Sequence, residues 1–398
     1  MNVHEQRLEA MKRRISGEPV AKICLNLGKS RVWFYKWWSR YQELGPEGLI
    51  DYSRKAHTPV GKTDIKMENA IVNLRKLKEK RDQEKTKYAL IGAPSIAQEL
   101  KELGFKDIPS TSTINNILNR HNLLNPMIPK EKDSWNKRDY PVPSAQYPND
   151  VHQMDFVGPW YLKEDSTKYY FAVLKDVASL SVSIEAIDKK NSKIAFDFII
   201  SSFQSLGIPI ILQVDNALEF RGSNRYPRSF GCFIRLCLLL GVEVLFIPPK
   251  SPWRNGNVEN FNGLLEKLLM NTQKFTEFAQ VKAEIPAFLE FCNERHVHKP
   301  LKYLTSKEFR EQHQDHIRLL DKFFYQPKKK KLPISDGKVS FIRRIGKNGQ
   351  VGILTEKFDI DKDLAHEYVY ATIFTADEVL QVFHNKEQIK EFEFKLPK

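Results

Sequence analysis

The stretch VEVLFIPPKSPWRNGNVENFNGLLEKLLM, residues 242–270, predicts a buried strand, a turn rich in Pro and Gly, and a long helix. The apolar side chains of this helix recur at helical spacing and form one stripe, which must face a core. Glu259 and Asn262 then lie on the opposite face, together with Gly263 and Glu266. The stretch therefore places an acid, Glu259, at the start of a packed helix, directly after a turn.

The residues before this stretch alternate between strand and helix patterns. Three consecutive strand patterns come first, then an amphipathic helix, a buried strand and a buried helix. Consecutive antiparallel strands followed by strands with crossover helices predict a mixed α/β sheet. The strands are expected at 151–162, 168–179, 181–188, 208–215 and 242–249, and the helices at 191–207 and 230–241.

Two further acids fall at informative places in this sheet. Asp155 lies inside an otherwise apolar strand, between Met154 and Phe156, where an unpaired carboxylate would cost several kcal/mol. Asp215 ends the fourth strand, at the carboxyl edge where open α/β sheets have their sites. Asp residues after strands and Glu residues in a first helical turn also serve as caps or dipole partners, and that reading stays open here.

A shared site becomes possible if the first and fourth strands are neighbours and the helix packs over their ends. Strands in a sheet lie about 4.8 Å apart, so Asp155, Asp215 and Glu259 would then converge. Three close carboxylates repel one another unless cations lie between them. Carboxylate oxygens are the ligands that Mg²⁺ prefers, and two such ions can activate a water or a 3′-hydroxyl for attack on a phosphodiester.

Three motifs in order, HQMDFVGP, LQVDNALEF and PPKSPWRNGNVENFN, resemble the catalytic core of bacterial insertion-sequence transposases. These are D-D-E recombinases with a retroviral-integrase-type, ribonuclease H-like fold. The resemblance covers about residues 149–310. It implies a Mg²⁺-dependent polynucleotidyl transferase and endonuclease in which Asp155, Asp215 and Glu259 hold two Mg²⁺ ions, with Mn²⁺ as a substitute. It also implies DNA contacts by Arg254 and Asn255 in the turn before the last acid.

The chain departs from the family pattern at three places. Ala217 stands where the family commonly has Gly, and Ala would be strained if the turn needs a positive φ. The spacer 216–258 is longer than usual, and RGSNRYPRS, residues 221–229, is the expected insertion. In the family a basic residue often stands two helical turns after the last acid, and here that position is Glu266. Lys267, the next residue, is displaced about 100° around the helix, and we expect it to contact DNA.

The first 125 residues show two helix-turn-helix patterns. In the first, Gly28 marks the turn between 20–27 and a helix that Ser30 caps. In the second, a Ser/Thr cluster at 110–113 caps a helix rich in Asn. We expect both second helices to contact DNA, although a Trp-rich helical core with a solvated basic face is the alternative for the first. The expected contacts are Ser30, Arg31, Lys36 and Arg40 in the first unit and Asn115, Asn116, Asn119 and Arg120 in the second.

The C-terminal residues change to short strand patterns. An Asn-Gly hairpin signal, Asn348-Gly349, lies between two β-rich runs, and more short strands follow. We therefore expect a small β-barrel at 326–398. Four lysines precede it, Lys328, Lys329, Lys330 and Lys331, and we expect them to contact DNA phosphates.

Composition agrees with a nucleic-acid partner. The chain has 63 Lys and Arg against 49 Asp and Glu, a net charge of +14. Its four cysteines form no pairs at zinc-finger spacing, and no apolar run is long enough for a membrane span. We expect a bacterial cytoplasmic protein, associated with the nucleoid, that binds double-stranded DNA at element ends and targets, has no membrane partner and forms a homo-oligomer on DNA.

The full sequence thus predicts a multidomain DNA transposase that cleaves and joins DNA strands, in integration and recombination. A catalytically inactive, domesticated DNA-binding regulator and a structure-selective nuclease of the same fold remain alternatives. The expected fold is all-α at the N-terminus, α/β ribonuclease H-like in the centre and β at the C-terminus. The expected domains are a helix-turn-helix unit at 1–60, a second, winged-helix-like unit at 61–125, a linker at 126–148, the integrase-type core at 149–325 and the β-barrel at 326–398.

Overall fold

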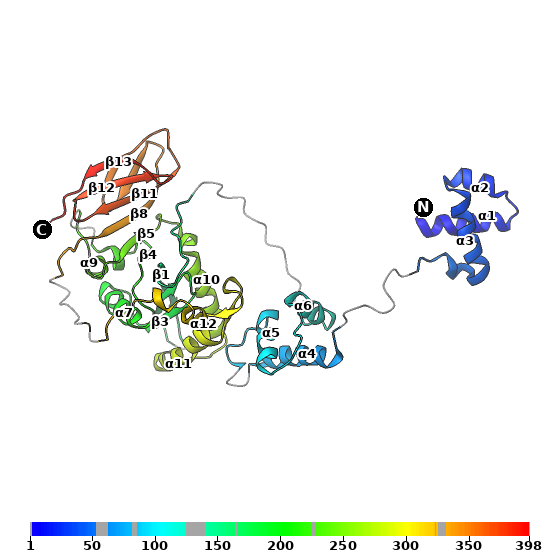
Figure 1. The fold of residues 1–398 in the computed structure, drawn as a ribbon, viewed down its shortest axis with the longest axis horizontal. Coiled ribbons are helices and arrows are strands. Elements are labelled where there is room, and N and C mark those ends of the chain that lie inside the picture. The colour runs from blue at the N-terminus through cyan, green and yellow to red at the C-terminus, as the bar shows by residue number, and fades with distance from the viewer. Residues whose placement is uncertain are drawn as a thin grey trace. The chain divides into compact units, whose positions relative to one another are not determined.

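The computed structural model describes residues 2–52, 63–81, 86–124, 140–163, 165–223, 228–322, 324 and 332–397. The chain divides into two compact units, Met1–Asp64 and Ile65–Lys398 (Figure 1). No helix in the described ranges is long and apolar enough to cross a membrane.

The first unit is a bundle of three helices, α1 (Val3–Ile15), α2 (Val20–Leu27) and α3 (Arg31–Leu44), followed by a 3₁₀ turn at Gly45–Leu49. Gly28 ends α2 in the left-handed region, at φ 62°. The Ser30 hydroxyl then caps α3 by accepting from the backbone N–H of Trp33 at 3.1 Å. The helix-turn-helix predicted at these residues is therefore present, and its core is built around Phe34 and Trp37.

The second unit begins with three more helices, α4 (Ile65–Lys80), α5 (Ala93–Glu102) and α6 (Thr111–Arg120). Ile71, Ile96 and Ile114 are fully buried between them. Ser110 caps α6 by accepting from the Thr113 N–H at 3.2 Å. These helices form the second helical unit that the Asn-rich pattern predicted.

The centre of the second unit is a mixed sheet. Strands β1 and β2, and β2 and β3, pair antiparallel, whereas β4 pairs parallel with both β1 and β5. This matches the predicted order of three antiparallel strands followed by parallel ones. The strands are β1 (Val151–Trp160), β2 (Tyr169–Asp176), β3 (Val182–Ile187), β4 (Ile211–Val214) and β5 (Glu243–Phe246).

Helices cover both faces of this part of the sheet. On one face, α7 (Ser192–Ser205) and α9 (Cys232–Leu239) bury a core that includes Phe196, Phe203 and Phe233. On the other, α10 (Gly256–Leu265) and α11 (Phe278–Glu290) pack Phe261 and Phe288 against Phe171 and Val173. Because both faces are buried, the central strands are apolar throughout, apart from a few polar residues that need an explanation. The remaining helices of this part are α8 (Leu218–Arg221) and α12 (Ser306–Glu311), and β6 (Val297–His298) pairs with β7 (Leu304–Thr305).

The C-terminal strands extend the same sheet. Strand β8 (Lys338–Arg344) pairs parallel with β5, with Val339 beside Val244 and Phe341 beside Phe246. The order over the described residues is β13-β12-β11-β8-β5-β4-β1-β2-β3 (Figure 1). The expected small β-barrel is not confirmed, because four of the six C-terminal strands in the described residues continue the open central sheet and the other two pair with each other. The other C-terminal strands are β9 (Gln350–Ile353), β10 (Glu356–Asp359), β11 (Tyr368–Phe374), β12 (Val379–His384) and β13 (Glu387–Glu393).

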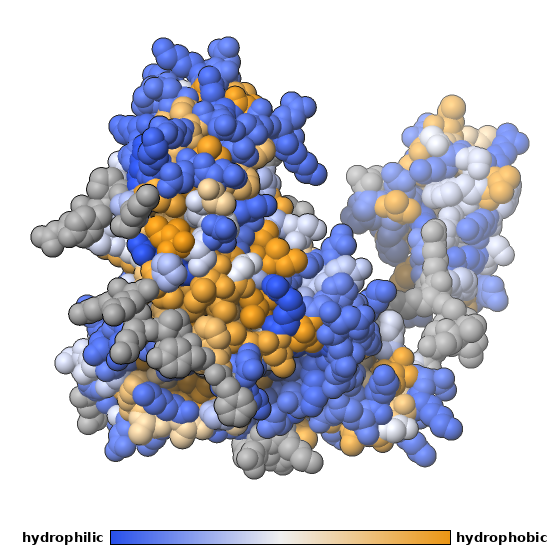
Figure 2. All heavy atoms as spheres, turned by 60° about the vertical axis from the view of Figure 1, so that its left-hand side comes forward, coloured by the Kyte–Doolittle hydropathy of each residue, from blue (hydrophilic) through white to orange (hydrophobic). Residues whose placement is uncertain are grey.

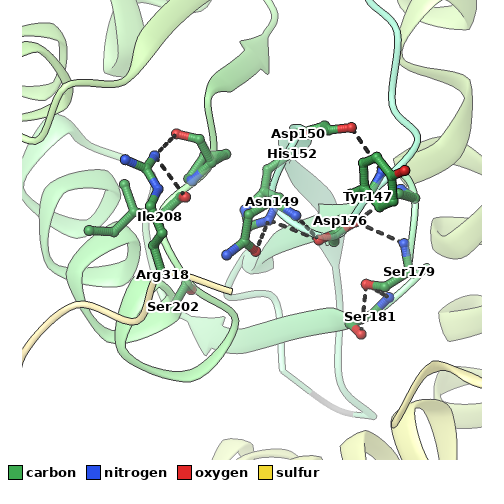
Figure 3. A network of polar contacts seen from close by, with 12 residues as sticks. Tyr147, Asn149, Asp150, His152, Asp176, Ser179, Ser181, Ser202, Ile208 and Arg318 are labelled. Atoms are coloured by element: carbon green, nitrogen blue, oxygen red, sulfur yellow. Dashed lines mark hydrogen bonds and ion pairs between the residues drawn. The ribbon is translucent and has the colours of Figure 1, made fainter. Parts of the chain in front are cut away.

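A buried polar network holds the start of β1 to the end of β2 (Figure 3). Asp176, fully buried, accepts from the backbone N–H of Asn149 at 2.7 Å and of Ser179 at 2.9 Å, and lies 3.3 Å from His152 Nε2. Burial alone would raise the pKa of Asp176, but His152 and these N–H donors together lower it below its ordinary value. Asp176 therefore stabilises the sheet at the amino end of β1.

Candidate active site

Asp155 lies on β1, half-buried between two core residues. Its Oδ2 accepts from the Asn262 amide at 3.1 Å, and its Oδ1 accepts from the Phe156 N–H at 2.8 Å. Burial raises the pKa of Asp155, and these two hydrogen bonds offset only part of that effect. The side chain is thus a partly desolvated carboxylate that neutral donors hold.

Asp215 lies beside it, directly after β4. The register of the parallel pair places Gln153 opposite Gln213, so the two aspartates follow at equivalent positions of neighbouring strands. Burial raises the pKa of Asp215 first, and the negative charge of Asp155 raises it further. The positive charge of Lys190 acts in the opposite direction on both aspartates.

Glu259 reaches the same region from the first turn of α10. Burial raises the pKa of Glu259, and so does the charge of Asp155. The charge of Asp155 therefore acts on both other acids, and a metal site shared by all three stays a prediction. In the described part of the chain, however, no three acidic, His or Cys side chains lie close enough to hold a metal ion together. The acids face one region without forming a closed ligand shell.

The donor set suits a hard divalent cation. All three side chains are carboxylates, and burial together with mutual repulsion disfavours their charged forms. A cation between them would relieve both effects, and oxygen ligands are those that Mg²⁺ and Mn²⁺ take. Three oxygen donors of this kind fit the ions that the sequence resemblance implies.

The departures from the family pattern do not disturb this geometry. Ala217 has φ −60° and ψ 148°, an extended conformation that any residue adopts, so its side chain causes no backbone strain. The expected insertion is closed at its base, where Gly222 and Gly231 pack so tightly that a Cβ on either would meet the other's backbone. Beyond that base, Arg228 pairs with Glu356 of β10 at 2.8 Å. Residues 224–227 lie outside the described ranges.

Four residues at the site were not expected from sequence. Asn262 contacts Asp155, and its spacing from Glu259 on one helix face was the available signal. Arg343 of β8 donates to the Asn216 amide oxygen at 2.7 Å and to the Ile247 carbonyl at 3.0 Å, so a C-terminal strand braces the residue after Asp215. The other two are the paired glutamines, Gln153 and Gln213.

The expected DNA contacts in the helical units differ in accessibility. Arg31 and Lys36 are exposed on α3. Arg40 is engaged within the unit, because it donates to the Ile50 carbonyl at 2.7 Å and stacks on Tyr52 at 3.9 Å. On α6 all four expected residues, Asn115, Asn116, Asn119 and Arg120, are exposed, and Arg120 also pairs with Glu68 at 3.2 Å.

The DNA contacts expected around the active site also differ in how exposed their side chains are. Lys267 is exposed in the turn of π-helix that follows α10, Glu266–Met270. Asn255 is only 3% exposed, and its amide is used in hydrogen bonds to Gln213 and to the Met154 carbonyl. Arg254 lies half-buried over the Tyr140 ring, 3.8 Å from its centre. Lys328, Lys329, Lys330 and Lys331 lie outside the described residues.

Comparison with protein families agrees with this arrangement. Residues 240–305, which include β5, the turn and α10, match the integrase core domain. This part of the chain is therefore similar to an integrase core. Residues 1–50 and 33–118 match homeodomain-like domains, which are helix-turn-helix DNA-binding modules.

Solved structures of retroviral integrases resemble the integrase-type core. The HTLV-2 integrase catalytic core domain in complex with magnesium is 22% identical, with 42% of this chain and 99% of that chain covered and a TM-score of 0.32. The catalytic core domain of BIV integrase is 20% identical, with 42% of this chain and 97% of that chain covered and a TM-score of 0.33. The simian T-cell lymphotropic virus intasome, in complex with PP2A regulatory subunit B56 gamma, is 20% identical, with 59% of this chain and 80% of that chain covered and a TM-score of 0.37. The match at residues 240–305 carries the likeness of this chain to integrase cores.

Proposed function

We propose that this chain is a DNA transposase that binds the ends of its own mobile element and catalyses cleavage and strand transfer with divalent metal ions. The observation that carries the proposal is the placement of Asp155, Asp215 and Glu259. They come from β1, from the end of β4 and from α10, and the charge of Asp155 acts on both of the others. An integrase-type core behind homeodomain-like units supports the same function.

In this proposal the three carboxylates would hold Mg²⁺, with Mn²⁺ as a substitute. Bound there, the metal would supply Lewis-acid activation of a water or a DNA 3′-hydroxyl and would stabilise the leaving oxygen. The chain's own residues do the positioning. Asn262 orients the Asp155 carboxylate through its amide, and Arg343 fixes the residue after Asp215. Cleavage and joining are each one displacement at phosphorus, so no covalent bond to the protein is needed.

DNA binding is assigned to the helical units. Exposed Arg31 and Lys36 on α3, and the exposed Asn residues of α6, would face the major groove and its flanking phosphates. The net charge of +14 favours such contacts. Two separate helix-turn-helix units can recognise a long sequence at an element end. A nuclease that selects DNA by its shape would not need them.

Joining two ends at one target requires more than one active site, so we propose a homo-oligomer on DNA. One face of the molecule bears a broad gathering of hydrophobic side chains framed by hydrophilic ones (Figure 2). Exposed apolar areas of this kind mark contact surfaces with other chains. This surface supports assembly.

The proposal is tested by incubating the full-length protein with a duplex that carries the DNA flanking its gene, a target plasmid and Mg²⁺, and by sequencing the products. We expect flank 3′-ends joined to plasmid DNA at many positions. Sequence-specific binding without cleavage or joining would identify a DNA-binding regulator instead. Cleavage without any joined product would identify a nuclease.

A further inference from the structure

Two buried glutamines hold the turn before Glu259 to the strands that carry the aspartates. Gln153 on β1 is 5% exposed and Gln213 on β4 is 3% exposed. They are register partners, and each lies two residues before its aspartate, on the same face of its strand. A polar side chain at such a position must be hydrogen-bonded or it destabilises the core.

Gln153 supplies the N-terminal cap of α10. Its Oε1 accepts from the backbone N–H groups of Asn257 and Val258, both at 3.1 Å. Asn255, the residue at the cap position, makes no side-chain cap bond to the helix. The first turn of α10, which carries Glu259, is therefore capped by β1 rather than by its own sequence.

Gln213 holds the preceding turn in the opposite sense. Its Nε2 donates to the Arg254 carbonyl at 3.0 Å and to the Asn255 Oδ1 at 3.1 Å. Asn255 in turn donates to the Met154 carbonyl at 3.3 Å, next to Asp155. Residues 254–258 are thus tied to both aspartate strands, and Glu259 follows immediately.

We propose that Gln153 and Gln213 are positioning residues that set the register of α10, and with it the distance of Glu259 from Asp155 and Asp215. Neither glutamine contacts the metal or the DNA in this account. The inference rests on the proposed function for its catalytic consequence, but not for its structural one. The two residues differ in role: Gln153 acts only as an acceptor towards the turn, and Gln213 only as a donor.

This difference gives a test with opposite expected outcomes for the same substitution. A carboxylate at 153 can still accept from both N–H groups, whereas a carboxylate at 213 cannot donate and would face the Arg254 carbonyl. We therefore compare Gln153→Glu, Gln153→Met, Gln213→Glu and Gln213→Met, with Gln312→Glu as an added charge on an exposed residue after α12.

The first measurement is amide hydrogen exchange, which needs no activity. We expect the Asn257 and Val258 amides to exchange at least about tenfold faster in Gln153→Met, and to keep their protection in Gln153→Glu and Gln312→Glu. In both Gln213 variants the amides of 254–258 should lose protection. Unchanged exchange in Gln153→Met, or equal behaviour of the two Glu variants, would overturn the proposal.

The second measurement is single-turnover cleavage at saturating DNA, with DNA affinity measured separately without a catalytic metal. Loss of outer positioning residues typically lowers metal affinity or activity by about 10- to 100-fold. We expect a loss of that size in Gln153→Met and both Gln213 variants, a higher Mn²⁺ requirement and unchanged DNA affinity. Partial rescue is expected in Gln153→Glu. A fall in DNA affinity with unchanged cleavage would refute positioning. If the wild-type protein cuts no DNA, the proposed function fails. The exchange result still decides whether Gln153 and Gln213 hold residues 254–258 in place.

Discussion

Replacing Asp215 by Asn should stabilise the metal-free protein. Burial and the neighbouring charge of Asp155 raise the pKa of Asp215 in the folded state. A carboxyl whose folded pKa lies above its unfolded pKa stabilises the fold at low pH, and this contribution is lost as the pH rises through the folded pKa. At pH 7 the ionised group therefore opposes folding. Relief of unfavourable charge commonly stabilises a protein by about 0.5–2 kcal/mol, and each kcal/mol raises the Tm of a core of this size by roughly 2–4 °C, so we expect a gain in that range.

The same substitution should remove stabilisation by metal. A ligand at 100 times its Kd stabilises the folded state by about 2.7 kcal/mol, which corresponds to roughly 5–10 °C in Tm for a core of this size. We expect this rise when wild-type protein is titrated with Mn²⁺ in a thermal unfolding assay, and no rise in Asp215→Asn. Asp188→Asn, an exposed aspartate after β3, should keep the wild-type response. If wild type and Asp215→Asn share one metal-free Tm and one Mn²⁺ response, the repulsion and the shared site are both refuted.

Three further outcomes follow from individual side chains. Arg343→Leu leaves the Asn216 amide oxygen without its donor and the Ile247 carbonyl with only the Asn216 amide as a donor, so the free energy of unfolding should fall by about 1–3 kcal/mol in urea titrations. The pKa of Asp176 is lower in the folded than in the unfolded protein, so its ionised carboxylate stabilises the fold above the unfolded pKa. This contribution is lost as the pH falls through the folded pKa. Asp176→Asn should therefore flatten the loss of stability measured between about pH 5 and 3. Ser30→Ala removes the cap of α3 and should cost about 1 kcal/mol, seen as faster amide exchange at Trp33.

Local sequence signals predicted the central sheet and the elements that carry the three acids, whereas their joint role stays a prediction. Asp155 and Asp215 could be paired because neighbouring strands lie about 4.8 Å apart, and the register of Gln153 with Gln213 agrees with that argument. The apolar stripe of α10 also placed Glu259 and Asn262 on one face, away from the core residue Phe261. These inferences needed only periodicity and the geometry of strands and helices.

The remaining features depend on partners that are distant in sequence. The parallel pairing of β8 with β5 leaves no local pattern, so short C-terminal strands suggested a separate barrel instead. Asn255 reads as an exposed turn residue, yet Gln213 and the Met154 carbonyl bury it. Arg40 likewise finds Tyr52, outside its own helix. A polar residue in a motif can therefore make hydrogen bonds within the fold instead of contacts with DNA, and sequence alone does not distinguish these two roles.

The most direct test of the central claim is metal-dependent cleavage of a supercoiled plasmid that carries the DNA flanking the gene. Wild type would be compared with Asp155→Asn, Asp215→Asn and Glu259→Gln at equal DNA occupancy. We predict nicks at the flanks with Mg²⁺ or Mn²⁺ in wild type and none in the three variants, all of which still bind. Cleavage that persists in any one of the variants would contradict a site built from these three carboxylates.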